Sequence, residues 1–98
     1  MRIAILGNDS THTYLFAKLL LSNPYVENIR INLNSIWGEN EINNSKLEKE
    51  FGKKLVKKNI EEALHDIDFA LVLGRFPDSH FKHAHYAISK GIGVFVDK

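Results

Sequence analysis

Apolar residues occur in short runs separated by polar turns, and the spacing inside each run predicts the element it forms. Residues 3–6 predict a short apolar strand, and residues 68–73 are a near-continuous apolar run, which is typical of a central parallel strand covered on both faces. Residues 26–33 alternate apolar and polar positions, which predicts a strand with one drier face. Residues 54–57 predict a brief edge strand, and residues 94–96 predict the last strand.

Four helices are predicted between these strands. The first, over residues 12–22, is apolar on nearly all sides and stops at Asn23-Pro24, because proline cannot continue the hydrogen-bond ladder. The polar stretch 35–44 is predicted to be a loop. The remaining helices are expected at residues 46–51, after the N-cap Asn59, and at residues 79–90 before the C-cap Gly91.

Five strands alternating with four helices predict an α/β domain of the Rossmann-like, doubly wound type. Its parallel sheet is expected in the order 3-2-1-4-5, with helices on both faces. Ligands bind such sheets at the carboxyl ends of the strands where the order reverses, here between the first and fourth strands. The loops at that point are residues 7–12 and 74–79, with residues 34–35 to one side and 97–98 to the other.

The turn after the first strand carries the first candidate chemistry, and it reads Gly7-Asn8-Asp9-Ser10-Thr11-His12. Against the dinucleotide-binding pattern G-x-G-x-x-G only Gly7 is kept, because Asp9 and His12 stand at the other two glycine positions. Ser10 and Thr11 still offer hydroxyl and backbone N–H groups at a helix N-terminus, which is an anion-binding arrangement. The simpler alternative is a strand-to-helix turn in which Asp9 or Ser10 only caps the helix.

Composition narrows the function classes. The 98 residues suffice for one domain, but not for a cofactor domain and a substrate domain together. The net charge of +1 gives no basis for binding nucleic acid or an anionic membrane, and the absence of cysteine excludes disulfides and thiolate chemistry. No apolar run approaches the roughly 20 residues of a membrane span, so we expect a cytoplasmic protein.

The chain resembles a known family, most specifically in its second half. The residues that carry the resemblance are Arg75, His80, Ala84 and Gly91, followed by Val94-Phe95-Val96-Asp97-Lys98. They resemble the Gfo/Idh/MocA oxidoreductases, in which a helix opening on histidine leads through a glycine to a strand ending in Glu/Asp-Lys-Pro. The first turn fits a divergent branch of that family, with Gly7, Asp9 and His12 in place of the glycine motif. The resemblance covers the whole chain and implies an NAD(P)-binding domain.

The resemblance also implies a catalytic residue. Lys98 matches the family's lysine beside the nicotinamide and the substrate. Because the family's second domain would follow this lysine, we expect residues 1–98 to be one cofactor domain and a fragment that lacks the substrate domain. In the joined enzyme, hydride would pass between the nicotinamide and a carbon bearing a hydroxyl, such as that of a sugar or cyclitol. The 98 residues alone are not expected to catalyse it.

The sequence does not distinguish NAD from NADP as the cofactor. The acidic residue expected about 20 residues beyond the glycine turn, which would hold the ribose hydroxyls, is missing, and Asn34 or Ser35 stands there. An amide or hydroxyl can bond the ribose and does not repel a 2′-phosphate. The predicted cofactor-binding residues are Gly7, Asn8, Asp9, Ser10, Thr11, His12, Asn34, Ser35, Gly74, Arg75, His80 and Asp97.

Some of these residues admit two interpretations. His80, together with Arg75, would favour a phosphate or carboxylate in the crevice, but His80 could equally cap its helix. His12 could face the ligand or pack against the protein. Trp37 could stack on an adenine or anchor its loop to the core.

Two other kinds of site are excluded. A metal site on His80, His83 and His85 fails, because on a helix only the first two share a face. A phospho-receiver domain has the same sheet order but needs an aspartate at the end of the third strand, where Lys57 and Lys58 stand.

Two function classes remain. One is the cofactor domain of an NAD(P)-dependent oxidoreductase, favoured by His80 and by Asp97-Lys98. The other is a degenerate, non-catalytic Rossmann module that binds another nucleotide or anion or mediates protein interaction, favoured by Asp9 and the missing ribose acid. Without a second domain, self-association as a homo-oligomer would cover apolar surface left on the sheet.

Overall fold

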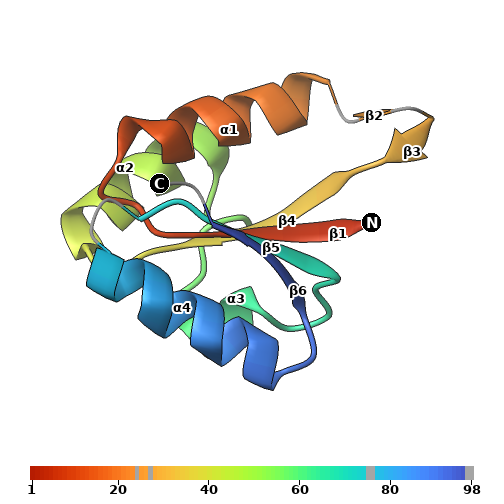
Figure 1. Cartoon of the computed structure of the whole chain (residues 1–98). Helices are drawn as coiled ribbons and strands as arrows, with labels where there is room; N and C mark the ends of the chain where they lie inside the picture. The colour runs from red at the N-terminus through yellow and green to blue at the C-terminus, as the bar shows by residue number, and fades with distance from the viewer. Residues whose placement is uncertain (24, 27, 75–76, 97–98) are drawn as a thin grey trace.

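A parallel sheet runs through the molecule between two layers of helices (Figure 1). The computed structural model describes residues 1–23, 25–26, 28–74 and 77–96. In chain order the elements are β1 (Arg2–Leu6), α1 (Thr11–Ser22), β2 (Tyr25–Val26), β3 (Ile29–Arg30), β4 (Asn32–Trp37), α2 (Glu41–Phe51), α3 (Ile60–Ala63), β5 (Phe69–Val72), α4 (Pro77–Ser89) and β6 (Gly93–Val96). Within these described ranges, no helix is long and apolar enough to cross a membrane.

The main sheet has the order β4-β1-β5-β6, and every neighbouring pair is parallel. The chain first adds β4 on one side of β1 and then crosses to add β5 on the other side, so the order reverses at β1. Leu6 pairs with both Trp37 and Val72, and Val72 pairs with Val96, so the carboxyl ends of all four strands meet at one edge. The predicted Rossmann-like fold is confirmed.

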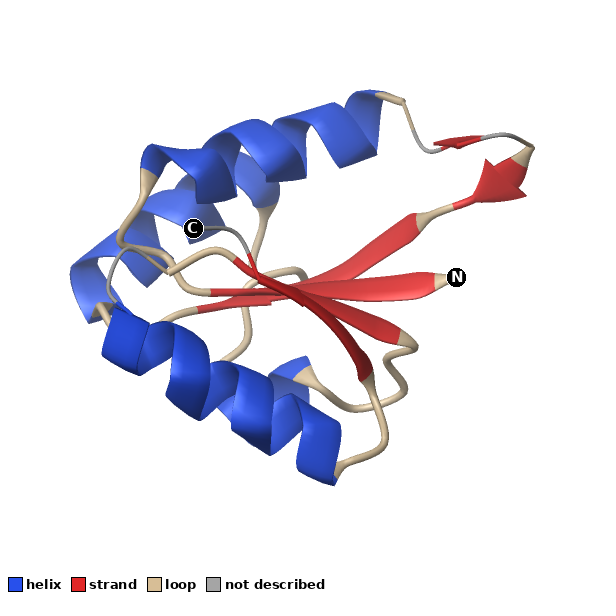
Figure 2. Ribbon diagram, in the orientation of Figure 1, coloured by secondary structure: helices blue, strands red, loops and turns tan. Residues whose placement is uncertain are grey.

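Each face of the sheet has its own core (Figure 2). Successive side chains of a strand point to opposite faces, so Ile3 and Ile5 of β1 pack on one face and Ala4 and Leu6 on the other. Helices α1 and α2 cover the first face, where Ala17 and Leu47 complete the core. Helices α3 and α4 cover the second. The second core contains Ala63, Leu64, Ile67, Ala70, Val72, Ala87 and Ile92.

The predicted second strand, over residues 26–33, was misplaced. Its first part forms the small antiparallel hairpin of β2 and β3, and the strand of the main sheet is β4, which continues to Trp37. The pairing of β1 with β4 shifts register between Ile3 and Ala4. Because this irregularity interrupts the strict alternation, the sequence pattern does not reveal where the strand ends.

The predicted third strand is reduced to one bridge, which lies beside β4 where the order 3-2-1-4-5 places it, whereas the predicted loop over residues 35–44 was wrong. Of residues 54–57, only Val56 joins the sheet, through a single parallel bridge to Ile36. Helix α2 begins at Glu41, inside the predicted loop, because the Asn40 side chain caps it by accepting a hydrogen bond of 3.0 Å from the backbone N–H of Asn43. The predicted first, third and fourth helices are confirmed by α1, α3 and α4.

Candidate functional site

The turn after β1 is held close to the start of the loop after β5. Gly7 has a φ of +106°, and its backbone N–H donates a 2.7 Å hydrogen bond to the Trp37 carbonyl oxygen. A Cβ at Gly7 would lie within 2.6 Å of the Gly74 Cα. Both the conformation and the space therefore require glycine at this position.

Helix α1 begins directly after this turn. Ser10 is its N-cap, and the Ser10 hydroxyl oxygen accepts a 3.2 Å hydrogen bond from the backbone N–H of His12. Thr13 donates its hydroxyl to the Gly7 carbonyl oxygen at 2.6 Å, which fixes the helix to the turn. No acidic residue lies in the first turn of α1. The positive end of the helix dipole therefore faces the edge of the sheet where the strands end.

Asn8 joins this turn to the loop after β4. Its amide nitrogen donates to the Asn40 carbonyl oxygen at 2.6 Å and to Asn44 Oδ1 at 2.7 Å, and its own Oδ1 accepts from the Asn40 N–H at 3.2 Å. Asn44 in turn donates to the Gly38 carbonyl oxygen at 2.8 Å. Asn8 is buried. Its side chain therefore serves the protein, and a cofactor would meet Asn8 through its backbone.

A pocket of about 340 Å³ opens between these loops. Residues that line it are Gly7, Asn8, Asp9, Glu39, Asn40, Gly74 and His83. It lies where β1, β4 and β5 end, at the reversal of strand order predicted to hold the ligand. Four of the predicted cofactor-binding residues are thus brought together here: Gly7, Asn8, Asp9 and Gly74.

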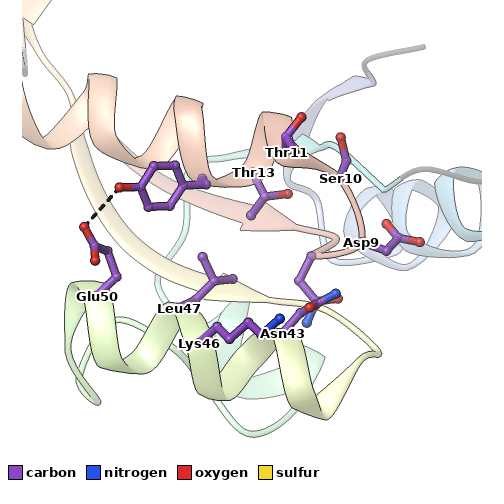
Figure 3. A pocket seen from close by; sticks show the side chains of 10 residues that line it. Asp9, Ser10, Thr11, Thr13, Asn43, Lys46, Leu47 and Glu50 are labelled. Carbon is purple, nitrogen blue, oxygen red and sulfur yellow. Dashed lines mark hydrogen bonds between the residues drawn. The ribbon is translucent and has the colours of Figure 1, made fainter.

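A second pocket, of about 490 Å³, lies between α1 and α2 and shares Asn8 and Asp9 with the first (Figure 3). Ser10 and Thr11 line its outer end. Its far end is closed by Tyr14, whose hydroxyl donates to Glu50 Oε1 at 3.1 Å. Figure 3 shows the Asp9 carboxylate directed away from this groove. Asp9 therefore places its charge beside the first pocket, which it also lines.

Glu39 is a site residue that the sequence did not reveal. It follows the carboxyl end of β4 by two residues and lines the 340 Å³ pocket. Its Oε1 accepts hydrogen bonds from His83 Nε2 at 3.1 Å and from Lys82 Nζ at 3.4 Å. The hydrogen bond from His83 is the main reason why the pKa of the Glu39 carboxyl lies below its ordinary value. A carboxylate thus stands near the position where a ribose-binding acid is expected.

His83 lies beneath this carboxylate in the core of the molecule. Its side chain is 2% exposed, and its ring packs edge-on against Trp37, with ring centroids 5.4 Å apart. Burial lowers the pKa of His83, and the hydrogen bond to Glu39 offsets only part of that effect. His83 is therefore neutral at pH 7. Among the described residues no group of three potential metal ligands occurs.

The other predicted site residues are placed as follows. Asn34 and Ser35 lie inside β4 and do not border the crevice, and the buried Ser35 hydroxyl donates to the Ala63 carbonyl oxygen. The half-buried His80 forms a hydrogen bond between its Nε2 and the Gly74 carbonyl oxygen, which fastens α4 to the loop after β5. His12 is exposed on α1. Arg75, Asp97 and Lys98 lie outside the described residues.

The fold and this crevice define a Rossmann-like nucleotide-binding domain of the doubly wound class. No family model matches the sequence, and no curated protein sequence matches it. Solved structures do match along the whole chain. GenD2 from gentamicin A biosynthesis, solved in complex with NAD, is 25% identical with a TM-score of 0.77, and the match covers 100% of this chain and 26% of GenD2.

Two further structures share the fold. UDP-N-acetylglucosamine 3-dehydrogenase GnnA from Acidithiobacillus ferrooxidans is 16% identical with a TM-score of 0.78, over 100% of this chain and 29% of GnnA. Biliverdin reductase from Synechocystis sp. PCC 6803, in complex with biliverdin and NADP⁺, is 19% identical with a TM-score of 0.56, over 98% of this chain and 37% of that protein. The resemblance to oxidoreductases of the Gfo/Idh/MocA type is confirmed. This chain spans less than two fifths of each of these three proteins.

Proposed function

We propose that this chain is the dinucleotide-binding domain of an NAD(P)-dependent oxidoreductase. The observation that carries the proposal is the convergence of three features at one crevice: the close approach of Gly7 to Gly74, the N-terminus of α1, and the carboxylate of Glu39 beyond β4. A dinucleotide needs a close backbone approach for its pyrophosphate, donors for that charge, and an acceptor for its ribose hydroxyls. The bound dinucleotide would supply the hydride chemistry.

Within this proposal the cofactor is NAD in preference to NADP. The Glu39 carboxylate can accept hydrogen bonds from the 2′- and 3′-hydroxyls of the adenosine ribose. The same charge repels a 2′-phosphate. GenD2, which is 25% identical to this chain, was solved with NAD. Asn34 and Ser35 do not take this role in the proposal, because β4 carries them away from the crevice.

The substrate and the catalytic step belong to the same proposal. We place the reaction at a hydroxyl or carbonyl carbon of a sugar-like or cyclitol substrate, and two of the similar proteins support this choice, since GnnA is a UDP-N-acetylglucosamine dehydrogenase and GenD2 is from gentamicin A biosynthesis. Lys98 would exchange the proton with the substrate oxygen, and a second domain would enclose that substrate. The reaction would take place in the cytoplasm.

Calorimetric titration of the 98-residue chain with NADH, NADPH and ATP tests this function. We expect micromolar binding of NADH. Ser10→Asp keeps an N-cap but adds a charge where the pyrophosphate would lie, so it should weaken NADH binding at least about fivefold. Ser45→Asp, which adds the same charge at an exposed position of α2, should not. A folded chain that binds neither dinucleotide would contradict the proposal.

A non-catalytic module is the second candidate. Asp9 favours it, because this carboxylate lines the pocket in which a pyrophosphate would otherwise approach the turn. Such a module would bind a smaller nucleotide or an anion. Binding of ATP without binding of NADH or NADPH, in the same titrations, would identify it.

A further inference from the structure

The hydrogen bond between His83 and Glu39 joins the interior of the molecule to the rim of the crevice. Both residues line the 340 Å³ pocket. The His83 side chain is 2% exposed, whereas that of Glu39 is 49% exposed. Lys82 also reaches Glu39 Oε1, but its side chain is 75% exposed and its bond is longer, at 3.4 Å. The buried imidazole is therefore the firmer of the two donors.

The hydrogen bond fixes the tautomer of His83. An ionised carboxylate can only accept, so Nε2 must carry the proton that is donated to Glu39. Nδ1 then presents a lone pair, and this buried atom has no hydrogen-bond partner among the described residues. An unpartnered buried nitrogen is unfavourable for stability, and an aliphatic side chain would pack beside Trp37 without that cost. Stability alone therefore does not account for a histidine here.

The bond also determines which oxygen of Glu39 remains for a ligand. His83 and Lys82 both donate to Oε1, and Oε2 has no partner within the described ranges. Resting on the proposed function, we propose that His83 is a positioning residue that holds Glu39 Oε1 from below so that Oε2 is presented to the adenosine ribose. His83 thereby sets the preference for NAD over NADP, although it contacts neither cofactor.

The preference follows from the fixed position of the charge. A carboxylate held by one oxygen accepts ribose hydroxyls with the other at little entropic cost, and it cannot turn aside when a 2′-phosphate arrives. A carboxylate released by loss of His83 is free to move into solvent, since its remaining donor is on an exposed lysine. Loss of His83 should therefore weaken the binding of NADH and at the same time strengthen the binding of NADPH.

The ratio of the NADPH to the NADH dissociation constant measures this effect. We expect His83→Leu to lower the ratio roughly tenfold, the usual effect of one hydrogen bond to a charged group. His83→Gln restores an N–H donor of similar reach and should recover most of the ratio. Lys82→Met should change it less than about threefold. His85→Gln is the matched control, because His85 is exposed on the same helix and stacks on Phe81.

A coupling test separates positioning from a merely structural role. In a Glu39→Gln background, His83→Leu should no longer alter the ratio, because there is no charge left to position. Thermal unfolding of each variant checks the fold. A ratio that changes equally in both backgrounds, or that stays unchanged in folded His83→Leu, would overturn the proposal.

The pH dependence gives a second readout. Protonation of His83 would add a positive charge beside Glu39 and offset its repulsion of the 2′-phosphate, so the ratio should fall as the pH is lowered below 6.5 in wild type. In the part of the chain that the structure describes, the charges that act on His83 are Glu39, Lys82 and Asp9. The variant His83→Gln keeps these three charged groups, and the 2′-phosphate of NADPH titrates in the same way with either protein. The difference between the two profiles therefore isolates His83, and identical profiles would contradict the proposal.

Nitrogen NMR of the histidine rings tests the pair without any cofactor. We expect His83 in the Nε2–H tautomer, with a titration that Glu39→Gln shifts to lower pH because the hydrogen-bonded carboxylate is lost. Wild type that binds neither dinucleotide would defeat the proposed function. An Nδ1–H tautomer, or a titration that is unaffected by Glu39→Gln, would defeat the role of His83 even if NADH binds.

Discussion

Gly7 and Gly74 approach so closely that a Cβ on Gly7 would lie 2.6 Å from the Gly74 Cα. The ladder between β1 and β5 continues into this contact, because the backbone N–H of Leu73 donates to the Leu6 carbonyl oxygen at 2.8 Å. The loops that leave the two strands therefore start side by side, and the crevice opens between them. The one glycine of the dinucleotide pattern that this chain keeps is the one that this contact requires.

Replacement of Gly7 by alanine should destabilise the protein and close the crevice. The residue would suffer both the strain of a φ of +106° and the collision with Gly74. Gly52 is the matched control, because it has a φ of +101° but no atom within 4 Å of the position that a Cβ would take. Strain alone costs about 1–3 kcal/mol. We expect Gly7→Ala to lower the free energy of unfolding by at least about 1 kcal/mol more than Gly52→Ala in urea titrations. Equal losses would show that the collision is relieved.

Asn8→Ala should destabilise the loop that carries Glu39. The substitution leaves the N–H and carbonyl of Asn40 and the amide of Asn44 without their buried partner. The expected loss is about 1–3 kcal/mol in the free energy of unfolding, measured by urea denaturation. Asn34→Ala is the control, since Asn34 is exposed on β4, and it should change neither stability nor NADH binding. Loss of NADH binding in Asn34→Ala would instead support the contact between Asn34 and the ribose that the sequence predicts.

The fold could be predicted because its signals are local. The apolar run that forms β1 is buried on both faces, and the run that forms β5 is buried on one face and half-buried on the other. Ser10 and Asn59 cap helices as their residue types indicate. The end of β4 could not be predicted, because the register shift against Ile3 and Ala4 is a property of strand pairing. Helix α2 was missed in part because its asparagines are weak helix formers.

The candidate site was predictable only where it depends on the first turn. Gly7 and Ser10 have the roles that their residue types indicate. Glu39 was missed because the ribose acid was sought at the end of a strand that was placed too early. His83 was considered only as a metal ligand, and its pairing with Glu39 joins residues 44 positions apart. Such a contact depends on how α4 lies against the end of β4.

The stability of the protein should fall as the pH is lowered from 7, partly because of His83. Burial lowers the pKa of His83 below the ordinary value of 6.5, so the unfolded chain takes up a proton before the folded one does. Stability must then decrease from about pH 6.5 down through the folded pKa. In His83→Gln this part of the decrease should vanish, whereas in His85→Gln it should persist. Urea denaturation at about pH 5 and about pH 7 measures the difference, and equal pH dependence in wild type and His83→Gln would contradict the assignment.

Asp9→Asn should strengthen the binding of NADH. Asp9 lines the pocket beside the turn, where its negative charge opposes a pyrophosphate that the N-terminus of α1 would otherwise attract. Removal of one charge at the rim should lower the dissociation constant of NADH roughly fivefold, which corresponds to about 1 kcal/mol. Because salt screens this repulsion, the decrease should become smaller as the salt concentration is raised from about 0.05 to about 0.5 M. Glu41→Gln, an exposed charge in the first turn of α2, is the control and should have a smaller effect. Weaker NADH binding by Asp9→Asn would show instead that the Asp9 carboxylate accepts a hydrogen bond that stabilises the complex with NADH. Titrations with NADH at both salt concentrations distinguish the two outcomes.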